Sequence, residues 1–182
     1  MNYGAIKYCD IANGAGVRTS LFVSGCTHHC KGCFQPETWD FSFGEAFDEN
    51  VQKAILESLE PSYISGLTVL GGEPMEPSNQ RALAPFLEQV KQQFPEKNIW
   101  LYTGDVWEDI ASGTGLRRTE VTDRLLHCLD VLVDGLFVEE LKDLTLRFRG
   151  SSNQRLLDVP ASLVKGVPVL WQDEAVYSTH SM

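Results

Sequence analysis

The feature that most constrains the fold is the alternation of short apolar runs with segments whose apolar residues recur at helical spacing. Strands separated by helices favour a parallel sheet wound by right-handed crossovers. Fewer than eight such units fit into 182 residues, which favours a partial barrel over a complete eight-fold one. We therefore predict an α/β fold built as an open, partial (βα) barrel of about five to six mostly parallel strands.

The predicted elements follow directly from these runs. The predicted strands are Thr19–Ser24, Leu67–Leu70, Asn98–Tyr102 and Val131–Val133, with weaker candidates at Arg147–Gly150 and Val167–Trp171. The predicted helices are Gly44–Leu59, Ser78–Phe94, Trp107–Ala111 and Glu120–Cys128. Within the second helix, Ser78 is expected to cap the amino end and Pro85 to introduce a kink.

Length and charge limit the function classes. We expect one domain over residues 1–171, followed by a tail at 172–182. The net charge of −10 argues against a nucleic-acid-binding surface, which needs clustered Lys and Arg. No apolar run approaches the length of a membrane span, and the amino terminus lacks the pattern of a signal peptide, so we expect no membrane partner and a cytoplasmic location.

Three of the five cysteines stand close together as Cys26, Cys30 and Cys33. In a cytosolic chain such a group points to metal binding or catalysis rather than to disulfides. A cubane of four irons held by three cysteines leaves one iron without a protein ligand, and that iron is open to chemistry. Cys9 and Cys128 are far from this run, and we expect both to be small buried hydrophobic residues.

Polar and glycine residues follow the predicted strands at their carboxyl ends, where ligands gather in sheets of this kind. Gly71-Gly72-Glu73-Pro74 follows the second strand, Thr103-Gly104-Asp105 the third, and Asp134-Gly135 the fourth. The glycines allow close backbone approach, and Glu73 could hold an ammonium group. A tight turn before a helix would explain the same glycines without any function.

Two alternatives need other chemistry. Structural zinc could use the three cysteines together with His28 or His29, although zinc sites usually take their ligands from two separated knuckles. We expect both histidines to lie beside the cluster or at the surface instead, where a hydrogen bond could tune it. A non-catalytic electron carrier would leave the Gly-Gly-Glu-Pro turn unexplained.

Taken together, the motifs are similar to a known family. Cys-x3-Cys-x2-Cys followed by Gly-Gly-Glu-Pro resembles the radical S-adenosylmethionine superfamily. Further segments resemble the activating proteins of anaerobic ribonucleoside-triphosphate reductases within it, and the match runs over about residues 3–155. These segments are Asn13–Arg18, Gly25–Cys33, Thr38-Trp39, Asp130–Phe137 and Arg149–Arg155.

This resemblance implies the cofactors and the reaction. Cys26, Cys30 and Cys33 would ligate three irons of a [4Fe–4S] cluster, and S-adenosylmethionine would chelate the fourth. Reductive cleavage would give a 5′-deoxyadenosyl radical that takes a hydrogen atom from a glycine of the reductase. The implied electron donor is of the flavodoxin type. No catalytic side chain is implied beyond the cluster and S-adenosylmethionine.

The resemblance also implies the residues that contact S-adenosylmethionine. The expected contacts are Gly32, Cys33, Phe34, Gly71, Gly72, Glu73, Thr103 and Asp134. Arg18 or Arg149 could pair with a carboxylate, or each could form a structural ion pair. Activation of another glycyl radical enzyme, or a reaction on a small molecule, is the alternative within radical chemistry.

This sequence also departs from the pattern of the superfamily. Many members carry an aromatic residue where Gly32 stands, although a small residue is usual in the activating proteins that this chain resembles. Residues 156–182 extend beyond the compact pattern of those proteins, and their role is open.

Overall fold

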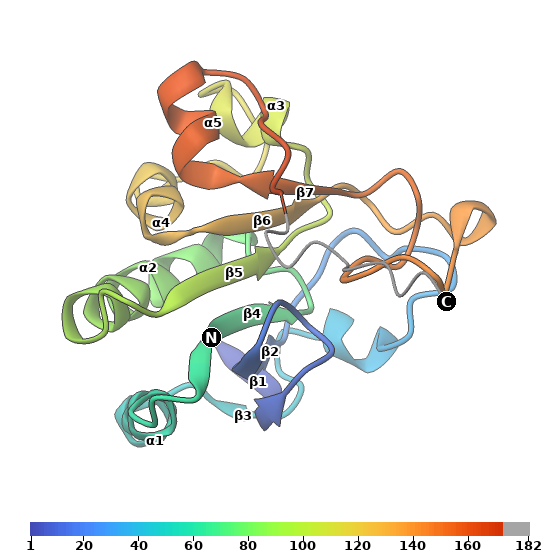
Figure 1. Cartoon of the computed structure of the whole chain (residues 1–182). Helices are drawn as coiled ribbons and strands as arrows, with labels where there is room; N and C mark the ends of the chain where they lie inside the picture. The colour runs from blue at the N-terminus through green and yellow to red at the C-terminus, as the bar shows by residue number, and fades with distance from the viewer. Residues whose placement is uncertain (173–182) are drawn as a thin grey trace, which may run out of the picture.

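The computed structural model describes residues 1–172 and builds them around one seven-stranded sheet with the order β3-β1-β2-β4-β5-β6-β7 (Figure 1). The strands are β1 (Asn2–Asp10), β2 (Val17–Val23), β3 (Glu45–Ala46), β4 (Ile64–Gly71), β5 (Asn98–Tyr102), β6 (Val131–Asp134) and β7 (Arg155–Asp158). The helices are α1 (Glu49–Leu59), α2 (Pro77–Gln93), α3 (Trp107–Ala111), α4 (Thr122–Cys128) and α5 (Val159–Lys165), with 3-10 turns η1 (Pro36–Trp39) and η2 (Glu139–Leu141).

The centre of the sheet is parallel and its margins are antiparallel. The pairs β2–β4, β4–β5 and β5–β6 are parallel. The pairs β1–β2, β1–β3 and β6–β7 are antiparallel. The predicted open α/β sheet with a parallel centre is confirmed, and all four firmly predicted strands are present. The sequence does not predict the antiparallel margins, because β1 and β7 carry only weak apolar patterns.

At the amino-terminal margin the predicted helix from Gly44 is wrong at its start. Residues 45–46 pair with β1 as β3, and the helix begins only after Asp48, whose carboxylate accepts a hydrogen bond from the Val51 amide at 3.0 Å. This cap satisfies one of the free amides of the first turn and fixes the boundary. Cys9 is a second correction, because its side chain is exposed.

The predicted cap of α2 and the two weaker strand candidates are wrong. Helix α2 begins at Pro77 with no side-chain cap, so Ser78 lies inside its first turn. Neither of the weaker strand candidates forms a strand, and the later segment contributes only an isolated bridge between Leu157 and Leu170. The segment that was not predicted, β7 followed by α5, is stabilised by Asp158, which caps α5 through the Ala161 amide at 2.8 Å.

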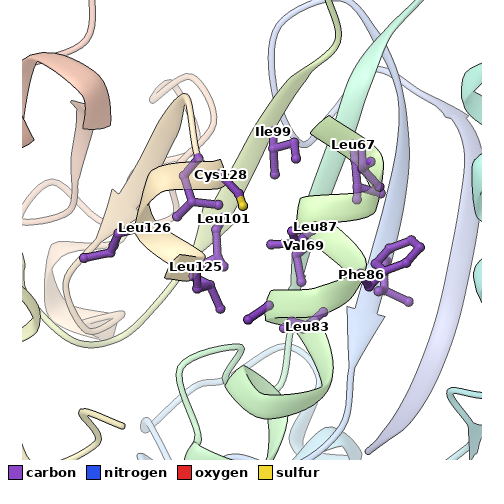
Figure 2. Packing of buried hydrophobic residues seen from close by; sticks show 14 of the residues in the cluster. Leu67, Val69, Leu83, Phe86, Leu87, Ile99, Leu101, Leu125, Leu126 and Cys128 are labelled. Atoms are coloured by element: carbon purple, nitrogen blue, oxygen red, sulfur yellow. The ribbon is translucent and has the colours of Figure 1, made fainter. Parts of the chain in front are cut away.

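Helices α1, α2, α4 and α5 cover one face of the sheet with apolar side chains. Figure 2 shows Leu67 and Val69 of β4 and Leu101 of β5 packed near Leu83 and Leu87 of α2. Each is fully buried, which stabilises the fold by roughly 1.5–3 kcal/mol per side chain. On α4, Cys128 belongs to the same cluster, as predicted from its sequence context.

The other face carries a mixed layer. Trp100, Val131 and Val133 form a small apolar cluster to which Phe148 and Trp171 are added. Beside it lies Arg18, which is completely buried.

No helix within residues 1–172 is both long enough and apolar enough to cross a membrane. The predicted tail covers residues 172–182. All of it except residue 172 lies outside the described residues.

Candidate functional site

The three cysteines lie on a loop that leaves the carboxyl end of β2 and is fastened at its base. The Gly25 amide donates to the Thr38 carbonyl at 2.8 Å, and the Cys26 amide donates to the Trp39 carbonyl at 3.2 Å. The Gly25 carbonyl in turn accepts from the Glu73 amide at 2.8 Å. Figure 1 shows this loop, in light blue, at the same edge of the molecule as the orange segment that follows β6.

A cavity of about 140 Å³ lies at this edge, between the loop and the carboxyl ends of the parallel strands. All three cysteines line it, together with five further predicted contacts, which are Phe34, Gly71, Gly72, Glu73 and Thr103. Its full lining is Cys26, His28, Cys30, Cys33, Phe34, Trp39, Leu70, Gly71, Gly72, Glu73, Tyr102, Thr103, Gly104, Gly135, Phe137 and Gln154. The strand ends and the cysteine loop therefore meet at one cavity.

A larger cavity of about 500 Å³ adjoins the first and shares several of its walls. Cys33 and Phe34 line both cavities, and the predicted contact Gly32 lines the larger one. Phe34 is 80% exposed, so an apolar ring stands free at the rim. The residue at position 32 is a glycine for a local reason, because its φ of +74° lies in the left-handed region that other residues rarely adopt.

The glycine pair at the end of β4 allows two segments of backbone to pack together. A Cβ on Gly71, whose φ is +108°, would lie 2.8 Å from the backbone of Phe22 and Val23. A Cβ on Gly72 would lie 2.6 Å from the Gly25 carbonyl oxygen. Any side chain at these positions would separate the β4 turn from the cysteine loop. Close approach is thus required first by the fold, and it brings the turn to the cavity wall.

The Glu73 carboxylate is buried, with 1% of the residue exposed, and is held by three donors. Its Oε1 accepts from the Met75 amide at 2.7 Å. Its Oε2 accepts from the Gly104 amide at 2.8 Å and lies 2.8 Å from His28 Nε2. These bonds join the cysteine loop to the ends of β4 and β5 through one side chain.

A second charged network lies behind the loop, centred on Arg117. Its Nε donates to Glu76 Oε1 at 3.1 Å and its Nη1 donates to Asp105 at 2.6 Å. Glu76 also accepts from the amide and hydroxyl of Thr27. Burial, followed by the charge of Glu73, raises the pKa of Asp105. Arg117 therefore anchors the beginning of the cysteine loop to the segments that follow β4 and β5.

The cysteine thiols are partly withdrawn from solvent. Burial raises the pKa of Cys26 to about 11, and burial likewise raises the pKa of Cys30. Thiolates are the ligands of iron–sulfur clusters, so loading this site releases protons.

Asp134 lines neither cavity, unlike the other predicted contacts. It is completely buried, and its carboxylate accepts from the Arg155 guanidinium and from the Trp107 amide at 2.8 Å. The neighbouring Gly135 lines the cavity in its stead. A contact between Asp134 and S-adenosylmethionine stays a prediction.

The donor set fits a cluster better than a single ion. The zinc site considered above needs His28 or His29 as its fourth ligand. His28 instead points to Glu73, and the His29 ring packs on Trp39 with centroids 4.7 Å apart. Three thiols that face one cavity agree with the larger body of an iron–sulfur cluster.

Comparison with known proteins identifies the family. A family described as "4Fe-4S single cluster domain" matches residues 12–157. The anaerobic ribonucleoside-triphosphate reductase-activating protein of Pasteurella multocida is 41% identical over 85% of this chain and 95% of that protein. The proteins of the same name from Enterobacteria phage T4 and Escherichia coli K12 are 42% and 36% identical, over 86% and 85% of this chain and 93% and 96% of those proteins.

The chain belongs to the family of anaerobic ribonucleoside-triphosphate reductase-activating proteins. The resemblance drawn from the motifs is thereby confirmed. The family match ends at residue 157, within β7, so α5 and the segment after it lie beyond it. Part of the extension noted in the sequence is thus structured.

The Arg149–Arg155 segment, which pointed to this family, closes one wall of the cavity. Gln154 Oε1 accepts from the amides of Gly150 and Ser151, and its Nε2 donates to the Gly135 carbonyl at 3.0 Å. Asn153 donates to the Leu136 carbonyl at 2.8 Å. The segment therefore fixes the loop after β6, which bears two of the lining residues.

Several lining residues were not predicted from the sequence. Gly104 and Gly135 were noted as turn residues, but no contact was assigned to them. Tyr102 ends β5 and its hydroxyl is buried without a hydrogen-bond partner among the described residues. Phe137 and Gln154 come from outside the cysteine and glycine motifs. Tyr102 and the two glycines stand at or directly after strand ends, whereas Phe137 and Gln154 lie in the Asp130–Phe137 and Arg149–Arg155 segments that carried the family resemblance.

Proposed function

We propose that this protein activates an anaerobic ribonucleoside-triphosphate reductase by generating a glycyl radical on it. The observation that carries the proposal is the meeting of Cys26, Cys30 and Cys33 with the Gly71–Glu73 turn around one cavity. It occurs in a chain that matches activating proteins over nearly their whole length. A structural zinc protein or an electron carrier would not need that turn.

When bound, a reduced [4Fe–4S] cluster supplies the electron that cleaves S-adenosylmethionine and so starts hydrogen abstraction from a glycine of the reductase. The chain's own residues hold and shield these groups. Cys26, Cys30 and Cys33 would hold the cluster, and the iron without a cysteine ligand would be open to the amino and carboxylate groups of S-adenosylmethionine. The cavity walls limit the access of water, which protects reactive species.

Individual contacts to S-adenosylmethionine are proposed from the same walls. Glu73 provides negative charge for the methionine ammonium group, while the Gly71 and Gly72 backbone lies beside it. Gly32, Cys33 and Phe34 offer backbone and apolar surface to the adenosyl part. Thr103, whose hydroxyl accepts from the Asp105 amide at 3.1 Å, stands at the end of β5 as a polar contact. Asp134 is retained as a proposed contact through its strand end.

We propose that residues 1–171 form one domain, an open, partial (βα) barrel of the radical S-adenosylmethionine type. This architecture would support the proposed function. In such an arrangement the parallel strands direct their carboxyl ends to a common site. We further propose a flavodoxin-type electron donor and a cytoplasmic location. The five cysteines are all free thiols, which agrees with a reducing compartment.

Anaerobic reconstitution tests the proposal. The protein is loaded with iron and sulfide, reduced, and mixed with S-adenosylmethionine, and 5′-deoxyadenosine release is measured. The reduced protein is then mixed with an anaerobic ribonucleoside-triphosphate reductase, and the glycyl signal is sought by electron paramagnetic resonance. We expect a coloured protein, cleavage, and a signal on the reductase. A colourless zinc protein without cleavage would refute the proposal.

A matched arm distinguishes the partner. The same reduced protein is mixed with a reductase variant whose radical-bearing glycine is replaced by alanine, and with a different glycyl radical enzyme. The signal should appear only on the unmodified reductase. A signal on the other enzyme alone would assign the protein to a different partner. Cleavage without a signal on either would favour a small-molecule substrate.

A further inference from the structure

His28 stands between the first two cysteines, and its ring is directed at the Glu73 carboxylate. The distance from Nε2 to Oε2 is 2.8 Å, and the His28 side chain is 10% exposed. Asp105 Oδ1 is the other carboxylate oxygen near this nitrogen, at 3.7 Å, which is too long for a hydrogen bond. The imidazole is therefore aimed at one acceptor.

The end of β5 is shaped to admit this ring. A Cβ on Gly104 would lie 2.7 Å from both Cδ2 and Nε2 of His28 and 3.0 Å from Leu136 Cδ2, so a larger residue would press hardest on the imidazole. The backbone φ at Gly104 is not in the left-handed region. The absence of a side chain is thus required by the contact with His28 and not by the backbone conformation.

The opposite ring nitrogen faces a donor. Arg117 Nη2 lies 3.5 Å from His28 Nδ1, and a guanidinium can only donate. Nδ1 therefore serves as the acceptor, which leaves the proton on Nε2, where it is donated to Glu73. The second network, which holds Arg117 through Glu76 and Asp105, thereby fixes the orientation of the first.

The remaining capacity of Glu73 gives this arrangement a purpose. An ionised carboxylate has about four acceptor sites. Within residues 1–172, three are used, by Met75, Gly104 and His28, which leaves one on a group that lines the cavity. A carboxylate held by three donors cannot turn, so the free acceptor site keeps one direction.

We propose that His28 is a positioning residue that aims the last free acceptor site of Glu73 at the methionine ammonium group of S-adenosylmethionine. This inference rests on the proposed function. It adds a role for a side chain inside the cysteine loop, so that the loop that holds the cluster also orients the group that binds the second cofactor.

Four variants test the proposal on reconstituted protein of equal iron content. His28→Ala should weaken S-adenosylmethionine binding about tenfold, because a hydrogen bond to a charged group is lost. His28→Gln keeps an N–H donor and should recover most of this affinity. Gly104→Ala should push the ring away and match His28→Ala. His29→Asn, in the same loop and compatible with the left-handed backbone at φ 50°, is the control and should change little.

The double variant supplies the decisive comparison. If Gly104→Ala acts by displacing His28, it should have no further effect on affinity once His28 is alanine. Additive losses in the double variant, or an unchanged dissociation constant in His28→Ala, would overturn the proposal. The change that S-adenosylmethionine causes in the spectrum of the reduced cluster should be altered in His28→Ala and restored in His28→Gln. A merely structural role would not produce this pattern.

A measurement on metal-free protein separates this inference from the proposed function. Nitrogen-15 chemical shifts of the His28 ring should show a protonated Nε2. A bare Nε2 cannot donate to Glu73 and would overturn the inference, whatever the enzyme does. Conversely, if wild-type protein never cleaves S-adenosylmethionine while Nε2 is protonated, the proposed function fails and the His28–Glu73 bond stands.

Discussion

Two buried polar networks lie at opposite ends of the parallel strands, and they differ in what they leave unsatisfied. Near the start of β2, Arg18 makes five hydrogen bonds, to Thr68, Ala15, Asn98 and Leu67, which equals its five donors. At the carboxyl ends, Glu73 uses three of about four acceptor sites and lines a cavity. A closed network serves stability, whereas an open one can receive a ligand.

The chemistry of the partners differs as well. Every oxygen atom bonded to Arg18 is neutral, although a carboxylate partner was one expectation from the sequence. Burial accordingly lowers the pKa of Arg18 to about 10, which still leaves it charged at neutral pH. Around Glu73, by contrast, His28 and Arg117 bring further ionisable groups together.

The largest effect should follow the loss of a cluster ligand. Cys30→Ala should abolish cluster binding and S-adenosylmethionine cleavage, because a three-cysteine set has no spare ligand. Iron analysis and 5′-deoxyadenosine release measure this. Cys128→Ala, on the helix-covered face, should keep both. A fully active Cys30→Ala protein would contradict the assignment of function to the cavity at the carboxyl ends of the parallel strands.

Removing the closed network should cost stability without changing affinity. Arg18→Met leaves Asn98, Thr68 and the Leu67 carbonyl without their donor, so we expect the free energy of unfolding to fall by at least about 3 kcal/mol. Denaturant titration of the metal-free protein measures this. S-adenosylmethionine affinity of the folded, loaded variant should stay within about twofold. A large loss of affinity would show that the two ends are coupled.

Removing the charge of Glu73 should lower the affinity for S-adenosylmethionine rather than the stability of the fold. Glu73→Gln keeps the shape and one carbonyl acceptor but loses the negative charge that we propose faces the methionine ammonium group. We expect affinity for S-adenosylmethionine to fall about tenfold to a hundredfold, with iron content retained. Equilibrium dialysis against labelled S-adenosylmethionine measures this. Unchanged affinity would indicate that the turn binds through its backbone alone.

The two ends should also respond differently to acid. Hydrogen bonds from Thr27 and the charge of Arg117 outweigh the opposing effect of burial and lower the pKa of Glu76. Such a group stabilises the fold above its unfolded-state pKa of about 4.3, and this contribution is lost as the pH falls through the lower folded value. In Glu76→Gln, the free energy of unfolding should therefore decrease less steeply with falling pH below about pH 5 than in the wild type. Arg18 stays charged there and adds no slope.

The smallest effect is expected at Tyr102, whose hydroxyl is buried and has no hydrogen-bond partner in the part of the chain that the structure describes. Tyr102→Phe removes only that hydroxyl, so metal-free protein should be as stable as wild type or up to about 1 kcal/mol more stable. Thermal unfolding measures this. A clear loss of S-adenosylmethionine affinity in the variant would show that the Tyr102 hydroxyl takes part in binding at the cavity. Marked destabilisation would instead reveal a hydrogen bond that the hydroxyl makes in solution.

The sequence predicts the parallel centre well because its strands are short, continuous apolar runs such as Leu67–Leu70. It also predicts which loops meet, since parallel strands bring their carboxyl ends to one edge. It does not predict β1, where polar and apolar residues are mixed, or the position of the first turn of α1, which depends on the Asp48 cap. Boundaries of this kind depend on single hydrogen bonds.

Site prediction was limited in a similar way. The cysteines and the Gly71–Glu73 turn are found by their pattern, and both line the cavity. His28 was expected only beside the cluster or at the surface, because nothing in its neighbourhood in sequence indicates Gly104 or Arg117. Asp134 looked available at a strand end, but Arg155 from the unpredicted β7 takes its carboxylate. Long-range partners decide which polar residues remain free.

The contact between Trp100 and Trp171 has a practical consequence. The two rings lie edge to face with centroids 5.0 Å apart, and Trp171 comes from beyond the family match. Two indole rings held at a fixed angle couple their electronic transitions and produce near-ultraviolet circular dichroism that vanishes when packing is lost. The chain therefore carries its own optical reporter of whether the segment after α5 is seated on the sheet, readable before any iron is added.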